Sequence, residues 1–362
     1  MWNEWEMSEM VNTVPTKNLA ESTDRRTGHV LLPVSVLLAG LFMAALAAWY
    51  TNANVMKTEK REFDFVCMEV QDRIAARINA HEQILLSAAA FLEGSDGVTR
   101  QKWKLYSAHQ KMDQHLPGIQ GLGFALLIPR EKLAQHIQDV RAEGFPEYQV
   151  RPEGDRELYS SIVYLEPFEG RNLRAFGYDM LSEPVRQVAM ERARDQDEAS
   201  LSGKVRLVQE TDQDVQAGTL MYVPVYGRGM LTDTVDQRRA AIRGWVYSPY
   251  RMADLMCGIL GKSDLLFAHP VHLYIFDGES ATPGALLYDS QPAAARSAGA
   301  STRLNFQWRV VVAGRPWTLN CTMNDSPIAR MVWLVLVGGM LISLSLAGFV
   351  SQQLNTRFQS ID

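Results

Sequence analysis

Glycine and lysine residues occur at spacings that could bind a nucleotide, and each spacing falls short of a known site. Gly261-Lys262-Ser263 has the form of the end of a phosphate-binding loop, but Met256 stands where that loop requires glycine. Gly121 and Gly123 begin a dinucleotide fingerprint, and Leu126 replaces its third glycine. The sequence therefore predicts neither kind of nucleotide site.

His269 and His272 are the residues whose spacing could suggest a metal pair. If their segment is a strand, positions i and i+3 face opposite sides, and no carboxylate is near them in sequence. Ordinary strand-edge histidines are the favoured interpretation. The sequence also lacks the G-x-S-x-G and H-E-x-x-H motifs. We therefore expect no catalytic residue, no metal, no cofactor and no enzyme activity in this chain.

Composition narrows the class of protein. The 362 residues are 47% apolar and 21% charged, which excludes a disordered chain. The 36 basic and 41 acidic residues give a net charge of -5, and the basic residues are spread along the chain, so nucleic acid is not expected as a partner. The three cysteines, Cys67, Cys257 and Cys321, show no C-x-x-C spacing and allow at most one internal bridge.

Two apolar segments organise the chain. Residues 30–50 and 331–350 carry no charge, and each is long enough to cross a hydrocarbon core of ~30 Å as a helix. Trp49, Tyr50 and Trp333 fit the aromatic residues found at membrane interfaces. We expect contact with membrane lipids at both segments, and the absence of charge inside them gives no ion path.

The flanking charges predict the orientation. Arg25 and Arg26 precede the first span, which places the short amino-terminal tail in the cytoplasm and residues 52–328 on the other side. Ala45-Leu46-Ala47 has the form of a signal-peptidase site, so a cleaved signal peptide is the alternative. The long apolar run and the aromatic pair after it favour an uncleaved anchor.

After the first span, apolar residues fall at strict 4-3 spacing on a helix that ends at Gly94-Ser95-Asp96-Gly97. Two interpretations stay open: an amphipathic helix packed on its own domain, or a helix that pairs with its twin in a homodimer, with Arg77 and His81 as polar positions. The positions at this spacing are Phe63, Cys67, Val70, Ile74, Arg77, His81, Ile84, Ala88 and Phe91.

Strand and helix patterns alternate beyond this helix without strict order, which predicts an α+β fold with antiparallel sheets in two groups. Ser182 is a plausible N-cap for the second helix. The expected strands are 119–128, 147–151, 158–166, 218–226, 241–248, 271–277, 285–289, 304–312 and 317–323, and the expected helices are 130–143, 182–196 and 249–260.

Three blocks, residues 176–186, 199–210 and 220–226, agree in order and spacing with the CHASE domain, and the chain resembles this family from about Arg61 to Asp325. CHASE domains are sensory modules of bacterial receptors and of plant cytokinin receptors. The resemblance implies a stalk helix followed by two PAS-like lobes, of which the membrane-distal lobe holds a small ligand. The expected domains are a cytoplasmic tail (1–29), a transmembrane helix (30–50), the stalk (51–93), a membrane-distal lobe (94–248), a membrane-proximal lobe (249–328), a second transmembrane helix (329–350) and a tail (351–362).

The resemblance also assigns candidate ligand residues. Asp179 matches the carboxylate that accepts hydrogen bonds from ligand nitrogens in the cytokinin-binding members. Ser202 stands where the plant receptors have a pocket threonine, and Arg206 keeps their arginine. Leu220, Tyr222 and Pro224 lie on the strand that lines the pocket. The alternative is that Asp179 starts the turn before the next helix, with Arg206 as a structural ion-pair partner.

The resulting prediction is a two-pass sensor of the bacterial inner membrane, with both termini cytoplasmic and the sensory domain periplasmic. Ligand binding would bias the flanking helices and so the state of a cytoplasmic or membrane output protein. Family members usually continue into a kinase or a cyclase, whereas this sequence stops at Asp362, so we expect no output enzyme in it. The alternatives are a ligand-free membrane scaffold and a membrane-tethered periplasmic enzyme.

Overall fold

The computed structural model describes residues 17–112, 118–261, 271–291, 302–324 and 329–359. The chain divides into two compact units. Residues Lys60–Asp325 form one, and the segments Met1–Glu59 and Ser326–Asp362 form the other.

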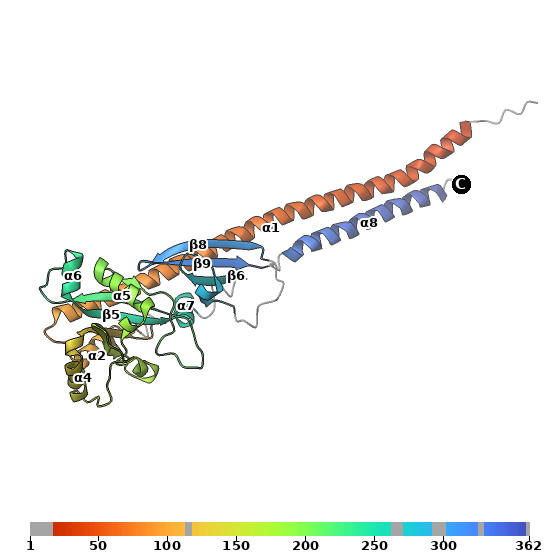
Figure 1. Ribbon diagram of the computed structural model, residues 1–362. Helices are drawn as coiled ribbons and strands as arrows, with labels where there is room; N and C mark the ends of the chain where they lie inside the picture. The colour runs from red at the N-terminus through yellow and green to blue at the C-terminus, as the bar shows by residue number, and fades with distance from the viewer. Residues whose placement is uncertain (1–16, 113–117, 262–270, 292–301, 325–328, 360–362) are drawn as a thin grey trace, which may run out of the picture. The chain divides into compact units, whose positions relative to one another are not determined.

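A single helix, α1 (Lys17–Gly94), contributes to both units (Figure 1). The expected first span and the expected stalk are therefore parts of one continuous helix, which ends at Gly94 as the sequence predicted.

The smaller unit pairs the first part of α1 with α8 (Ala329–Gln359). Both helices are long and apolar enough to cross a membrane. Small residues bring them together, since a Cβ atom added at Gly339 would lie 2.5 Å from the Cβ atom of Ala44. Large apolar side chains such as Phe42 and Trp333 are exposed on the outside of this pair, which suits a lipid environment better than water.

The larger unit contains a five-stranded antiparallel sheet. It joins segments far apart in sequence, because β1 pairs with both β2 and β5. The strand order is β2 (Leu158–Glu166), β1 (Leu122–Pro129), β5 (Ile242–Arg251), β4 (Gly218–Tyr226) and β3 (Ser200–Leu201).

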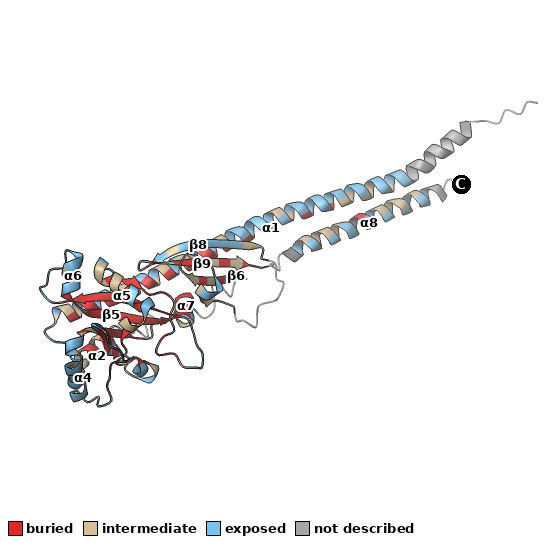
Figure 2. Ribbon diagram, in the orientation of Figure 1, coloured by how far each residue is buried: buried red, intermediate tan, exposed pale blue. Residues whose placement is uncertain are grey.

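The two faces of this sheet pack on different helices. Val246 and Tyr250 of β5 belong to the core cluster that includes α1 and Trp103 of α2 (Arg100–His109). Trp245 and Tyr247 of the same strand belong to a second cluster with α5 (Pro184–Gln196) and the 3-10 turn η3 (Met180–Ser182). Figure 2 shows β5 largely buried, with Arg243 near its start as the exposed position, as expected for a strand covered on both faces.

A second antiparallel sheet of four strands also packs in the α1 cluster, through residues such as Leu273 and Leu319. The β8–β9 hairpin turns at Ala313 and Gly314, both at positive φ (42° and 71°). The order is β7 (Leu286–Asp289), β6 (Val271–Asp277), β9 (Arg315–Met323) and β8 (Leu304–Val312).

The remaining elements are short and connect the strands. These connecting elements are η1 (Arg130–Lys132), α4 (Leu133–Ala142), η2 (Gly170–Ala175), α6 (Val235–Ala241), α7 (Met252–Leu260) and η4 (Pro283–Ala285). The helices α2 and α6 were not predicted from the sequence.

The α+β class and the antiparallel sheets are confirmed, and two local predictions are wrong. Residues 147–151 do not form a strand, because only Arg151 finds a bridge partner. Ser182 does not cap α5, since it lies in η3 and its hydroxyl donates to the carbonyl of Asp179. Glu183 is the cap, and its carboxylate accepts from the backbone N–H groups of the first turn.

The packing favours one of the two interpretations of the 4-3 spacing, the amphipathic helix packed on its own domain, and pairing with a twin helix stays a prediction. Phe63, Cys67, Val70 and Ile74 are buried in the core of their own unit, and the partly buried Ile84 packs against that core. The 4-3 spacing reports a buried helix face, and the surface that buries it is the chain's own sheets. The division of this unit into two PAS-like lobes stays a prediction, and β5 runs across the expected boundary at residue 248.

Candidate functional site

The α5 face of the five-stranded sheet combines an apolar surface with polar groups from two central strands. Alternation along β4 directs Tyr222 to this face and its neighbours Met221 and Val223 to the α1 face. Strand register then sets Tyr247 of β5 directly opposite Tyr222. The two rings lie side by side, with centroids 6.3 Å apart.

Both tyrosines are fully buried, and in the part of the chain that the structure describes neither hydroxyl has a hydrogen-bond partner. Burial raises the pKa of both phenols, so each stays protonated and keeps its donor. Gly123 makes room for the second ring, since a Cβ atom at this position would lie 2.5 Å from the Tyr247 ring. A buried hydroxyl without a partner is costly, and two adjacent ones call for an explanation.

Arg186 in the first turn of α5 brings a buried charge to the same cluster. Its side chain is 2% exposed, and its guanidinium lies 4.9 Å from the centroid of the Tyr178 ring. One terminal nitrogen donates to the Arg206 carbonyl at 3.1 Å. Nε makes no hydrogen bond among the described residues and lies 3.7 Å from the carboxylate of Glu183.

These three side chains act on one another. The positive charge of Arg186 partly offsets the effect of burial on the pKa of Tyr222 and of Tyr247. Each of these buried residues has a donor without a partner among the described residues, and we call Arg186, Tyr222 and Tyr247 the donor cluster. Such an arrangement can bind a group with several acceptor lone pairs.

Asp179, the first candidate from the sequence, is also fully buried on this side of the sheet, but its oxygens are occupied. It accepts from the Ser160 backbone N–H (2.8 Å) and the Leu181 N–H (3.1 Å), and Arg156 donates to its second oxygen at 3.0 Å. Burial raises its pKa, against the hydrogen bonds from Ser160 and the charge of Arg156. This geometry fits the start of the η3 turn, with Arg156 as the ion-pair partner in place of the expected Arg206; ligand contact by Asp179 stays a prediction.

The other candidates fall into two groups. Leu220, Tyr222 and Pro224 are buried on β4, as expected for a lining strand. Ser202 is buried, and its hydroxyl accepts from the Leu220 N–H at 2.9 Å, so it fastens the chain before β4. Arg206 is largely exposed and pairs with Asp212, while Asp179 pairs with Arg156; ligand contact by Arg206 stays a prediction.

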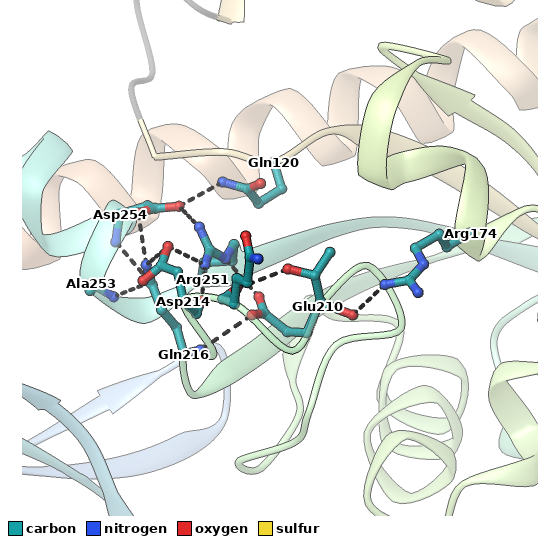
Figure 3. Close-up of polar contacts among 10 residues, drawn as sticks. Gln120, Arg174, Glu210, Asp214, Gln216, Arg251, Ala253 and Asp254 are labelled. Atoms are coloured by element: carbon teal, nitrogen blue, oxygen red, sulfur yellow. Dashed lines mark hydrogen bonds and ion pairs between the residues drawn. The ribbon is translucent and has the colours of Figure 1, made fainter.

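A second buried arginine, Arg251 at the end of β5, makes a complete network (Figure 3). Gln216 and Gln120 add hydrogen bonds to Asp254 of α7, at 3.0 and 3.2 Å. The network joins the start of β1, the connection before β4, and α7. The guanidinium forms ion pairs with the carboxylates of Glu210 (2.6 Å), Asp214 (2.8 Å) and Asp254 (2.7 Å).

An open groove of about 510 Å³ lies elsewhere, where α2 meets the end of β2, and its lining includes Arg100. The guanidinium of Arg100 is already engaged, because it pairs with Glu143 at 2.7 Å and lies over the rings of Phe145 and Phe176. The groove therefore offers space, whereas the donor cluster offers unused hydrogen-bonding groups.

Metal chemistry finds no support in the described residues, where no group of three metal-ligating side chains occurs. His272 contacts the Gln291 side chain at 2.9 Å. Lys262, Ser263 and His269 lie outside the described residues.

Two members of the donor cluster, Arg186 and Tyr247, were missed in the sequence. Tyr247 could have been found, because its strand was predicted and alternation sets its face. Arg186 could not have been found, since only the packing of α5 on β4 brings it to the tyrosines.

Residues 96–288, just over half of the chain, match the family model of the CHASE domain. No curated protein matches the chain.

Proposed function

This chain belongs to the CHASE-domain family, and we propose that it is the sensory part of a two-pass membrane receptor that binds a small ligand at its donor cluster. CHASE is a sensory and not a catalytic domain. It lies outside the cytoplasm in membrane sensors, and two apolar helices fit a two-pass protein.

The observation that carries the ligand site is the set of three buried groups, Arg186 Nε and the Tyr222 and Tyr247 hydroxyls, that have no hydrogen-bond partner in the described chain. Native proteins pair nearly all buried polar atoms, and exceptions occur where a ligand or water completes the bonds. The apolar surroundings, which include Trp245 and Met190, would hold the body of a small molecule.

The proposed setting is the bacterial inner membrane, with residues 52–328 in the periplasm and both termini in the cytoplasm. Arg25 and Arg26 before the first span support this orientation through the positive-inside rule. The exposed apolar side chains of α1 and α8 would contact lipid.

The sheet gives the signal a physical route. Tyr222 and Tyr247 lie on the α5 face, while Val246 and Tyr250 of the same sheet pack on the α1 side. Reordering of the two tyrosines on ligand binding would change the packing of neighbouring residues on α1. Because α1 continues into the first apolar segment, the change would bias the span and an output protein of the cytoplasm or membrane. A second copy of the chain stays a predicted partner.

Thermal unfolding of the full chain in lipid nanodiscs tests the ligand site. The probes are adenine, phenylalanine, diglycine, succinate and phenylacetate, and a ligand that binds only the folded state raises the Tm by mass action. We expect at least one probe to raise the Tm, and Tyr222→Phe to remove that rise.

Tyr250→Phe is the matched control, because this buried tyrosine lies on the same sheet but on the α1 face. It should keep the ligand effect. A rise in Tm that survives Tyr222→Phe and Tyr247→Phe together would contradict the site. If no probe raises the Tm of the parent chain, the ligand-free scaffold becomes the favoured alternative.

A further inference from the structure

The donor cluster is one-sided in its hydrogen bonding. A tyrosine hydroxyl can donate or accept, but the N–H at Arg186 Nε can only donate. A ligand that satisfies this group must therefore present an acceptor. A nitrogen-rich ligand that mainly donates would find its expected partner, Asp179, already bonded to Ser160, Leu181 and Arg156.

Charge makes the requirement sharper. Arg186 is 2% exposed, and the acidic side chain nearest to it is Glu183, at 3.7 Å and itself partly exposed. Asp179 is already paired with Arg156. A cationic group beside Arg186 would be repelled, and a neutral carbonyl would leave the charge as it is. A carboxylate would give the guanidinium a short, charge-assisted hydrogen bond.

The surroundings specify the rest of the molecule. The side chains that pack with the two tyrosines are apolar, among them Met180, Met190, Leu220 and Trp245. The indole N–H of Trp245 is already bonded to the Met190 carbonyl, at 2.9 Å, so this ring offers only an apolar surface.

We infer that the ligand is a small monocarboxylate with an apolar body, whose carboxylate binds Arg186, Tyr222 and Tyr247. This inference rests on the proposed function and names the chemical class for the same site. It also accounts for the cost of these three buried groups, because the bound carboxylate supplies acceptors that the described part of the chain does not provide.

The experiment compares carboxylates with their amides on the full chain in nanodiscs. The probes are acetate, isovalerate, phenylacetate and indole-3-acetate, with the corresponding amides and phenethylamine as a cationic control. We expect a Tm rise that grows with the apolar body, that is weaker for each amide and that is absent for phenethylamine. Arg186→Lys, which keeps the charge but loses the Nε donor, should weaken binding roughly tenfold or more.

Ligand-free stability separates this role from a structural one. Removing an unpaired buried hydroxyl removes its desolvation cost, so Tyr222→Phe and Tyr247→Phe should each raise the Tm without ligand by about 2–4 °C while they weaken carboxylate binding. This readout does not require Arg186 variants to fold.

The outcomes are distinguishable. If an uncharged probe stabilises the protein and loses its effect in Tyr222→Phe, the ligand site stands and the carboxylate class is overturned. If amides and carboxylates act equally, the class is overturned as well. If the tyrosine variants lower the ligand-free Tm, the hydroxyls are bonded within the fold, and both the class and the site are overturned.

Discussion

Arg251 and Arg186 are two buried arginines of the same sensory unit, and they differ in how far the chain itself satisfies them. Arg251 meets three carboxylates at 2.6–2.8 Å. Within the described residues, Arg186 has one carboxylate at 3.7 Å, a carbonyl partner, and two neighbouring tyrosines whose hydroxyls make no hydrogen bond. A completed network holds elements in place, whereas an incomplete one is available to a ligand.

The largest expected effect comes from breaking the completed network. Arg251→Met leaves the buried Glu210 carboxylate without its ion-pair partner, and we expect the free energy of unfolding to fall by about 3–5 kcal/mol. Urea unfolding of the full chain, followed by tryptophan fluorescence, measures this. Arg206→Met is the control, since it breaks an exposed ion pair and should cost within about 1 kcal/mol. Equal effects for the two variants would show that the Arg251 network does not hold the fold.

Asp179→Ala tests whether Asp179 stabilises the fold, as the Arg251 network does, or binds the ligand, as proposed for the donor cluster. Its oxygens accept from backbone N–H groups and from Arg156, so we expect a loss of about 1.5–3 kcal/mol without any ligand. The same urea titration measures it. Unchanged ligand-free stability together with lost ligand binding would instead place Asp179 with the donor cluster.

His81 is a buried titratable group on the α1 face of the sheet. It is fully buried and stacked on Tyr250, with the two ring centroids 5.3 Å apart. Burial, assisted by the charge of Arg77, lowers its pKa from 6.5 to about 3. Between these values the unfolded chain binds one proton more than the folded chain. The free energy of unfolding should therefore fall by about 1.4 kcal/mol per pH unit as the pH drops from 6.5 towards 3.

His81→Phe keeps a stacked ring and removes the titration. Urea unfolding at a series of pH values should show a shallower acid slope for this variant, by about one proton. Parallel slopes for the two proteins would mean that His81 is protonated inside the fold.

Ser202→Ala is expected to cost about 1 kcal/mol, because it removes one acceptor from the Leu220 N–H next to the cluster. Carboxylate affinity should stay within a few-fold if Ser202 only fastens the chain before β4. A large loss of affinity with little loss of stability would assign the Ser202 hydroxyl to the ligand.

The smallest effect is expected at Cys67. It is fully buried, and its interaction with Cys321, together with burial, raises the pKa of the Cys321 thiol. Mild oxidation in membranes should give no cross-link between copies through Cys67, so non-reducing electrophoresis of Cys67→Ser should match the parent. Cys257 is exposed, and any cross-linked band should disappear in Cys257→Ser. A band that depends on Cys67 would support the paired stalk.

The sequence determined the elements that depend on local pattern. The two long apolar helical segments follow from the length of uncharged apolar runs. The strands β2, β4 and β6 follow from short apolar or β-branched runs between turn residues, with bounds that match the structure. The 4-3 spacing correctly predicted a helix with one buried face. It could not name the covering surface, because a twin helix and the chain's own sheets select the same apolar residues.

Tertiary structure alone decided how the polar groups are used. The alternative to ligand contact paired Asp179 with Arg206, yet the fold pairs Asp179 with Arg156 and leaves Arg206 largely exposed. Arg186 and Tyr247 are more than fifty positions apart, and only the packing of α5 on the sheet brings them to one cluster. Whether a buried polar group finds a hydrogen-bond partner depends on atoms from several distant segments. The spacing of residues within one segment therefore cannot predict it.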